Sequence, residues 1–223
     1  MPSNILRRHA KACTLVTTSQ VCKDRLMEFS EVLARRRMVR NYTDEPIGSS
    51  SLDKIADAAF RAPSAGNSQA LSVIVVTDQE RREAIAGVAN EPAYVSMGFD
   101  PWVSRAPAHL IIAVSEQIYH DRYREPDKLG PDGEIDWPVP FWWVDAGAAM
   151  MAVLLAAVDE GLAAGFLGVH SLPDLAALLD LPDHYLPIGV ITLGHPAPDR
   201  RSGSLDRPKR PRETVVHREV WGS

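Results

Sequence analysis

The sequence predicts an α+β fold in which helices flank a mixed sheet. Segments with helical periodicity alternate with short β-branched runs along the whole chain, a pattern that excludes an all-α or all-β domain. The connections are uneven and include one long irregular segment, which argues against a regular doubly wound sheet. One run of alanine, leucine, methionine and valine is apolar on every side and predicts a long central helix surrounded by protein.

Composition narrows the class of protein. The chain has 223 residues, of which 45% are hydrophobic and 24% charged, as in a soluble globular protein with one large domain. The net charge is -5, whereas a nucleic-acid binder normally has a basic surplus. The only cysteines, Cys13 and Cys22, form neither a disulfide framework nor a metal motif, so a reducing cytoplasm is expected.

The first 26 residues are expected to be a disordered extension, and the folded domain to span residues 27–223. The extension has no continuous apolar segment before a small-residue cleavage site, so it is not predicted to be a signal peptide. The most apolar run, residues 144–158, is shorter than the roughly 20 residues of a membrane span and is bracketed by acidic residues. No membrane association is therefore expected.

The first half of the chain predicts three helices. The first covers residues 28–35. The second is capped by Ser50 or Ser51 and stopped by Pro63, and the third runs from an Asp78 cap to about residue 89. Apolar residues at helical spacing give the second helix one buried stripe: Leu52, Ile55, Ala56, Ala59 and Phe60.

Four segments predict strands. The β-branched runs 71–77 and 108–114 are each expected to be buried on both faces of the sheet. Residues 164–169 predict a short strand or turn, and residues 188–193 predict the last strand.

The second half also predicts a lid, two helices and a tail. Residues 115–143 lack a sustained period and are expected to form a lid or binding loop. Its aromatic residues either contact a substrate or pack on a partner subunit: Tyr119, Tyr123, Trp137, Phe141, Trp142 and Trp143. The central helix is expected over residues 145–161, and a short helix over 173–179. The proline-rich basic segment from Gly194 onward is too polar to bury itself and is expected to wrap over another surface.

Three segments carry the functional signal: residues 35–42, residues 61–69 and the C-terminal basic pair Arg207 and Lys209, which in isolation would belong to a flexible basic tail. Residues 35–42 contain four arginines. Blocks of like charge usually face water, but Met38 and Val39 separate Arg36 from Arg40 and place them on a turn that has to pack. Guanidinium groups held on such a turn suit phosphate, which they bind through paired, charge-assisted hydrogen bonds.

The second polar segment, residues 61–69, joins a helix to a buried strand. Proline, serine, glycine and asparagine are common in turns, so a plain polar turn is one interpretation. The other is a site that reads the edge of a flat heterocycle, because four side chains with donors and acceptors lie beside a hydrophobic strand: Ser64, Asn67, Ser68 and Gln69.

Together these segments resemble the nitroreductase family of FMN-dependent NAD(P)H oxidoreductases. The family's opening arginine pattern is matched by Arg36, Arg37, Val39, Arg40 and Tyr42, and its second pattern by Pro63, Ser64, Asn67, Ser68 and Gln69. The segments 165–170 and 193–196 and the basic tail are also similar, so the resemblance runs from about Met27 to the end of the chain. Three positions depart from the family. Met38 replaces a small polar residue that often touches phosphate, and Ala70 and Leu71 replace a common Pro-Trp pair.

The resemblance implies a homodimer with FMN at the subunit interface. It assigns the FMN phosphate and pyrimidine edge to Arg36, Arg37 and Arg40, with Arg207 and Lys209 closing on the phosphate. Ser64 and Asn67 would bond the ribityl chain or the ring, and the backbone at Gly168 and Val169 would face flavin N5 or O4. The full cofactor-binding set implied is Arg36, Arg37, Met38, Arg40, Pro63, Ser64, Ala65, Asn67, Gln69, Gly168, Val169, Arg207 and Lys209.

The implied function is a ping-pong oxidoreductase that takes electrons from NAD(P)H and reduces a nitroaromatic, a quinone or a similar electron-poor molecule. No catalytic side chain is required, because the flavin carries the chemistry. Alternatives are a flavin-sequestering protein without turnover, a dehalogenase or a deazaflavin-using relative. The histidines lack metal-site spacing, and the sequence contains no G-x-S-x-G, P-loop or G-x-G-x-x-G motif.

Overall fold

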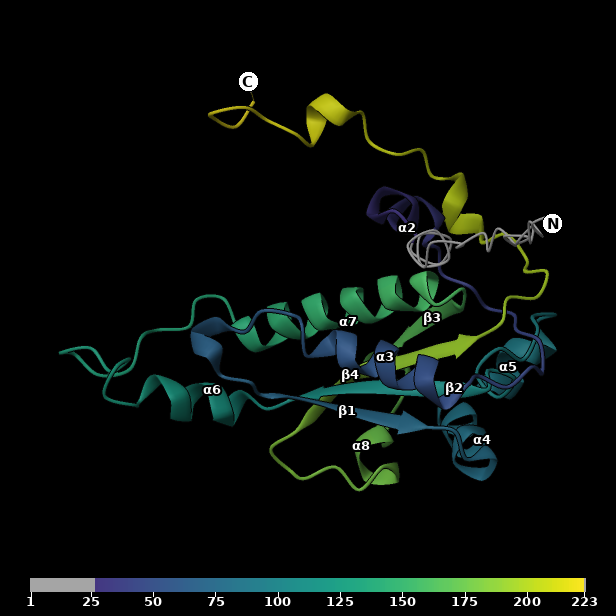
Figure 1. Cartoon of the computed structure of the whole chain (residues 1–223), viewed down its shortest axis with the longest axis horizontal. Helices are drawn as coiled ribbons and strands as arrows, with labels where there is room; N and C mark the ends of the chain where they lie inside the picture. The colour runs from purple at the N-terminus through teal and green to yellow at the C-terminus, as the bar shows by residue number, and fades with distance from the viewer. Residues whose placement is uncertain (1–26, 223) are drawn as a thin grey trace, which may run out of the picture.

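A four-stranded antiparallel sheet forms the centre of the protein. The computed structural model describes residues 27–222, so the predicted extension 1–26 lies outside the described residues. The strands are β1 (Leu71–Val76), β2 (Ala108–Val114), β3 (Ala163–Gly168) and β4 (Leu186–Gly194), in the order β1-β2-β4-β3 (Figure 1). One isolated parallel bridge, between Met38 and Ala164, extends the pairing beyond β3. The predicted α+β class is confirmed.

The sheet separates two helical layers. Helices α3 (Ser49–Ala59) and α7 (Phe141–Asp159) cover one face, and α4 (Gln79–Val88) and α8 (Leu175–Leu178) lie on the other (Figure 1). Strand β2 is buried along its whole length, as predicted. Its alternate side chains supply both cores: Leu110 and Ile112 pack with α3 and α7, whereas Ile111 packs with α4 and α8.

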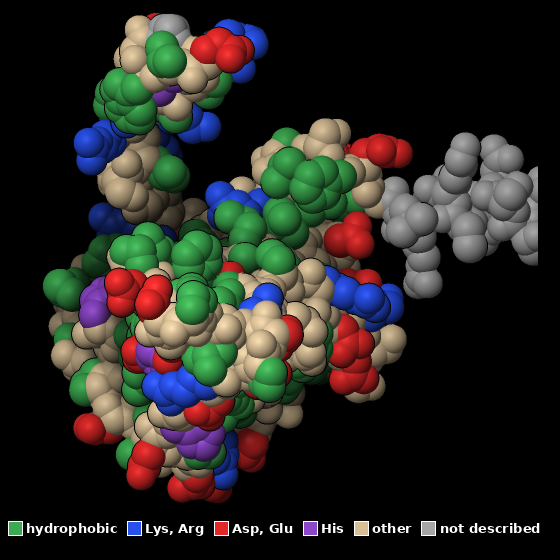
Figure 2. Space-filling view, turned by 90° about the vertical axis from the view of Figure 1, so that its left-hand side faces the viewer, with side chains coloured by type: hydrophobic (Ala, Val, Ile, Leu, Met, Phe, Trp, Pro, Cys, Tyr) green, Lys and Arg blue, Asp and Glu red, His purple; other side chains and the backbone are tan. Residues whose placement is uncertain are grey.

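Three further helices lie at the ends of the sheet or above it. They are α2 (Phe29–Arg35), α5 (Glu91–Ser96) and α6 (Glu116–Tyr123). Short 3-10 turns lie at Ala65–Asn67, Val169–Ser171, Gly203–Asp206 and Arg212–Thr214. Residues 207–222, called the C-terminal arm below, stand away from the body and are almost all exposed (Figures 1 and 2).

Several predicted details of the first half are wrong. Helix α3 begins after Gly48 without a side-chain cap, so neither Ser50 nor Ser51 caps it. Phe60 follows the last helical residue and is 64% exposed, so it leaves the buried stripe. Strand β1 is not buried on both faces, because it lies at the edge of the sheet and only Val76 is buried. The Asp78 cap is confirmed, since its Oδ1 accepts from the Arg81 amide at 2.9 Å.

The predicted irregular lid contains regular structure. Helix α6 occupies its first part, where the Ser115 hydroxyl accepts from the Ile118 amide. Helix α7 begins at Phe141, four residues earlier than predicted, because Trp142 is buried against the core cluster. Helix α8 is shorter than predicted, since Asp174 precedes it in a left-handed conformation with φ 63°. Helix α5 was not predicted at all.

Helix α7 is buried on one side only. Its inner residues pack on the sheet and on α3, but Val144 is 49% exposed and Met151 42% exposed on the other side. The prediction that this helix is surrounded by protein is therefore wrong for a single chain. The helix has the length and hydropathy of a membrane span, a test that core helices of globular proteins also pass.

Buried His109 makes folding stability depend on pH. Its Nε2 donates to the Val103 carbonyl at 2.8 Å, and Nδ1 has no partner among residues 27–222. Burial lowers the pKa of His109 from 6.5 to about 4. The unfolded chain therefore binds this proton at a higher pH than the folded chain does. The associated stability is present above pH 6.5 and is lost as the pH falls toward 4.

We expect this single group to remove about 3 kcal/mol of stability across that window, at about 1.4 kcal/mol per pH unit. Urea unfolding measured at several pH values should show a shallower pH dependence in His109→Gln than in the wild type. His184→Gln, at an exposed position, should retain the wild-type slope. Equal slopes for all three proteins would contradict the assignment.

Candidate functional site

The arginine segment docks on the edge of the sheet through its apolar residues. The Val39 amide donates to the Ala164 carbonyl at 3.0 Å. The buried Tyr42 hydroxyl lies 2.7 Å from Thr192 Oγ1 on β4 and donates to the Val39 carbonyl at 2.9 Å. Burial raises the pKa of Tyr42, so its hydroxyl stays neutral and can act as a donor. The segment is therefore held by packing and hydrogen bonds, as its sequence predicts.

Glycine is required where this segment meets β3. A Cβ on Gly165 would lie 2.5 Å from the Val39 carbonyl oxygen and 2.8 Å from Thr192 Oγ1. Because real Cβ atoms do not approach backbone so closely, a larger residue would push the arginine segment off the sheet.

The chain that follows β4 fixes the other side of the arginine segment. The Arg40 amide donates to Asp199 Oδ2 at 2.8 Å, and the Asn41 side-chain amide donates to the Pro198 carbonyl at 2.7 Å. Arg105 donates to Asn41 Oδ1 at 2.7 Å. The Arg40 guanidinium lies 5.7 Å from the centre of the Trp102 ring, within range of a cation–π contact.

A cavity of about 610 Å³ opens beside Arg40, within the size range of small-molecule sites. Arg40 and Gly168, both predicted as site residues, line this same cavity. Arg200 also lines it and lies 5.0 Å from the centre of the Phe99 ring. The wall also carries Asp100 and Asp199, so it combines aromatic rings with three arginines and two carboxylates. Rings and guanidinium groups suit a flat ligand that carries an anionic group.

Arg36 and Arg37 line a different cavity. It measures about 520 Å³ and lies by the C-terminal end of α7, where Val158 and Leu162 form part of its wall. Val39 lines this second cavity too, so the arginine segment separates the two spaces. Met38 is partly exposed between them.

The second predicted motif lies at the opposite end of α7. The Ala65 amide donates to Asp145 near the start of the helix, at 2.8 Å. The Ser68 hydroxyl donates to the Ala65 carbonyl at 2.6 Å, and the Gln69 amide donates to Ser64 Oγ at 3.2 Å. Between Asp145 and Val158 the helix spans about 20 Å at 1.5 Å per residue. A single chain therefore keeps the two motifs apart.

The remaining predicted residues are exposed. Val169 follows Gly168 at the end of β3 and faces solvent. Arg207 and Lys209 lie in the exposed C-terminal arm and line neither cavity. Pro63, Asn67 and Gln69 are exposed on their turn. The structure thus brings Arg40 and Gly168 together and leaves the other groups separate within one chain.

Several site residues were not predicted from the sequence. Trp102 and Phe166 line the larger cavity but belong to segments without a polar motif. Arg200 and Arg201 also line it, and the only signal for them was the basic character of the tail. Asp145 was noted only as a charge beside an apolar run, although it is buried and accepts two hydrogen bonds.

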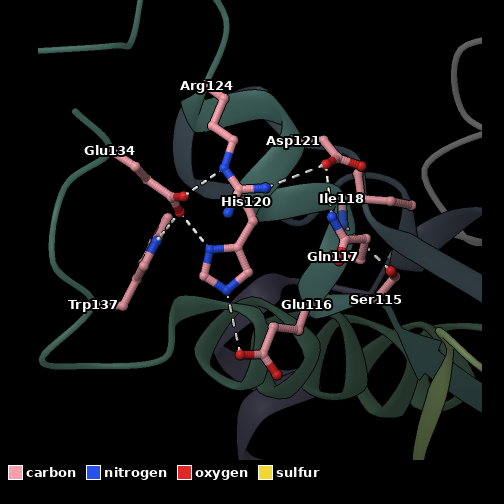
Figure 3. A network of polar contacts seen from close by, with 9 residues as sticks. All are labelled: Ser115, Glu116, Gln117, Ile118, His120, Asp121, Arg124, Glu134 and Trp137. Carbon is pink, nitrogen blue, oxygen red and sulfur yellow. Dashed lines mark hydrogen bonds and ion pairs between the residues drawn. The ribbon is translucent and has the colours of Figure 1, made fainter.

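The lid folds back on α6 through a polar network. Glu134 accepts from His120 and from Trp137, and pairs with Arg124 at 3.0 Å (Figure 3). The hydrogen bond to Glu134 raises the pKa of His120, and the Trp137 bond lowers the pKa of Glu134. Both pKa shifts favour the charged forms, protonated His120 and ionised Glu134. The contacts of Glu134 with His120 and Arg124 therefore tie the loop to the helix. Tyr119 and Trp142 are buried in the main core with residues of α3, α7 and the sheet, whereas Phe141 and Trp143 are exposed.

Comparison with known proteins agrees with this geometry. The model of the nitroreductase family matches residues 33–195, which include both predicted motifs and β1 through β4. The chain belongs to the nitroreductase family. This family member is 34% identical over 203 residues to FMN reductase [NAD(P)H] of Bacillus subtilis, covering 87% of this chain and 74% of the relative.

Other members are similar over the same span. Oxygen-insensitive NADPH nitroreductase of Salmonella typhimurium is 29% identical over 197 residues, covering 86% of this chain and 73% of the relative. The solved NADPH:FMN oxidoreductase of Vibrio harveyi, complexed with NAD+, superposes on this nitroreductase-family chain with a TM-score of 0.65 and 26% identity. That match covers 86% of this chain and 77% of the solved chain.

Replacement of Gly165 by alanine should disrupt the arginine segment of this nitroreductase-family protein. The added Cβ would overlap the Val39 carbonyl, and we expect a loss of about 1–3 kcal/mol in urea unfolding. The matched control is Gly87→Ala, in α4 with open space around it, which should gain about 0.5–1 kcal/mol. Similar responses of the two variants would refute the close contact.

Proposed function

We propose that this chain is an FMN-dependent NAD(P)H oxidoreductase that reduces a nitroaromatic, quinone or similar electron-poor molecule by a ping-pong mechanism. The observation that carries the proposal is the cavity lined by Arg40 and Gly168. The chain belongs to this family, and the family match includes both predicted motifs. The names of the relatives support FMN as the cofactor and NAD(P)H as the electron donor.

The donor set at the site fits FMN. Arginine presents several donors in a fixed fork that matches phosphate, and Arg36, Arg37 and Arg40 lie on one docked segment. Arg207 and Lys209 add cations on the exposed C-terminal arm, and Ser64 and Asn67 offer uncharged donors. When bound, FMN supplies the two-electron exchange between NAD(P)H and the acceptor.

The chain's own residues bind and orient, and no side chain is assigned as an acid or base. Asp199 fixes the Arg40 backbone amide, and the Arg40 guanidinium lies by the Trp102 ring, so the charge is placed beside the cavity. A fixed positive charge stabilises negative charge that develops next to it. The Phe166 and Trp102 rings in the cavity wall limit contact with water and strengthen that electrostatic effect.

We further propose that the protein acts as a homodimer whose two chains together complete each FMN site. The separation of about 20 Å along α7 between the two motifs supports this, because a partner chain could supply the motif that one chain holds away. The uncovered apolar residues of α7 and the exposed C-terminal arm also support it. A protein that consumes NAD(P)H is expected to work in the cytoplasm.

The proposal is tested by purifying the protein and identifying its released chromophore by mass. FMN is expected, and anaerobic NADH or NADPH should bleach the bound flavin, after which an added nitroaromatic or quinone should restore the yellow colour. A bound flavin that stays yellow with both nucleotides would favour a flavin-sequestering protein. Release of a deazaflavin in place of FMN would show that the cofactor is a deazaflavin.

The matched pair Arg40→Ala and Arg81→Ala separates a specific contact from a general charge effect. Arg81 is an exposed arginine on α4, away from both cavities. Loss of Arg40 should weaken FMN binding by about tenfold or more, as expected for a hydrogen bond to a charged group. Arg81→Ala should bind FMN like the wild type, and equal losses would remove Arg40 from the site.

The dimer is tested on the exposed face of α7. Sedimentation should give twice the mass of one chain for the wild type, and Met151→Glu should shift it toward the monomer because it places a charge on the uncovered apolar face. Val75→Glu places the same charge on the edge strand β1, where Val75 is exposed, and should leave the dimer intact. A monomeric wild type that binds FMN would overturn the two-chain site.

A further inference from the structure

The turn that carries Ser64 and Asn67 is held in a strained conformation. Three of its residues have positive φ: Gly66 at 62°, Asn67 at 55° and Gln69 at 52°. Residues other than glycine adopt this region uncommonly, and such strain persists only where the surroundings hold it. Side chains from two helices, α7 and α6, contact this turn.

Asp145 holds the turn from the side of α7. Asp145 is 5% exposed, and its Oδ2 accepts from the Ala65 amide at 2.8 Å and from the Tyr119 hydroxyl at 2.7 Å. A buried carboxylate needs such donors, because an unpaired charge in the interior is costly. One oxygen therefore joins α7, α6 and the first residue of the 3-10 turn.

Arg122 holds the turn from the side of α6. Its Nε donates to the Gly66 carbonyl at 2.9 Å. The other two nitrogens of the same guanidinium donate to the two carboxylate oxygens of Asp127, each at 2.7 Å. Asp127 therefore orients the guanidinium that contacts the turn. The ring of Tyr123 lies so close to Gly66 that a Cβ there would be 2.6 Å from it.

We propose that Asp145 and Arg122 are positioning residues that hold the Ser64–Gln69 turn in its strained conformation and thereby set how it meets the flavin. This inference rests on the proposed function. Arg122 belongs to α6, which also carries the His120–Glu134 network of the lid (Figure 3), so the turn and the lid contact the same helix through different side chains.

Three variants at the Asp145 contact test the proposal. Asp145→Ala leaves the Ala65 amide without its acceptor and should raise the Kd for FMN by about tenfold or more. Tyr119→Phe removes the other donor to the same oxygen, and should keep FMN affinity within about threefold because the Ala65 bond remains. Asp145→Asn should recover most of the affinity, since its amide oxygen can still accept from Ala65.

A second readout needs no flavin. Hydrogen exchange of the backbone in residues 64–69 should be faster in flavin-free Asp145→Ala and Arg122→Ala than in the flavin-free wild type. Arg124→Ala is the matched control, because Arg124 directly follows α6 and pairs with Glu134 and not with the turn. It should leave exchange in residues 64–69 unchanged, and Arg122→Ala, unlike Arg124→Ala, should raise the Kd for FMN.

The outcomes separate the two proposals. A wild type that binds no FMN refutes the proposed function, while the exchange data still decide whether these residues hold the turn. Wild-type FMN affinity and exchange in both Asp145→Ala and Arg122→Ala overturn the inference. A loss in Tyr119→Phe as large as that in Asp145→Ala also overturns it, because the Ala65 bond would then not be the cause. If Asp145→Ala fails to fold, FMN affinity and exchange in Arg122→Ala, compared with Arg124→Ala, decide the matter.

Discussion

The close contact between the arginine segment and β3 is the constraint on which the site depends. Gly165 lets the Val39 backbone approach the strand, and Tyr42 closes the contact by bonding both Val39 and Thr192. With the backbone fixed at this point, Arg40 lies beside the larger cavity, while Arg36 and Arg37 lie beside the smaller one. A close backbone contact and buried hydrogen bonds therefore determine where the charges are placed.

Helix α7 sets the distance between the two halves of the site. One end carries the Asp145 contact to the Ser64–Gln69 turn, and the other forms a wall of the cavity lined by Arg36 and Arg37. A rigid helix cannot shorten this distance, which is the reason for proposing that a second chain completes each site. The same helix leaves apolar side chains uncovered on its outer face, which is consistent with that arrangement.

Sequence signals failed where the answer depended on neighbours in space. Phe60 fits the apolar stripe of α3 by spacing, but the helix ends before it and leaves it in solvent. The run 71–77 has the composition of a central strand, yet β1 lies at the sheet edge. Helix α6 was missed because it has no apolar stripe. It is held by a Ser115 cap, by buried Tyr119 and by charged pairs to the lid, and none of these contacts follows a simple period.

By itself the sequence determined the α+β class, the buried strand β2, the Asp78 cap and the residues of both family motifs. These are local properties, since periodicity and capping depend on residues close together in the chain. Only the tertiary structure decided which arginines share a cavity with Gly168, which face of α7 stays uncovered, and that Asp145 supports the turn at Ala65. Those features arise from contacts between residues far apart in the chain, and no local pattern encodes them.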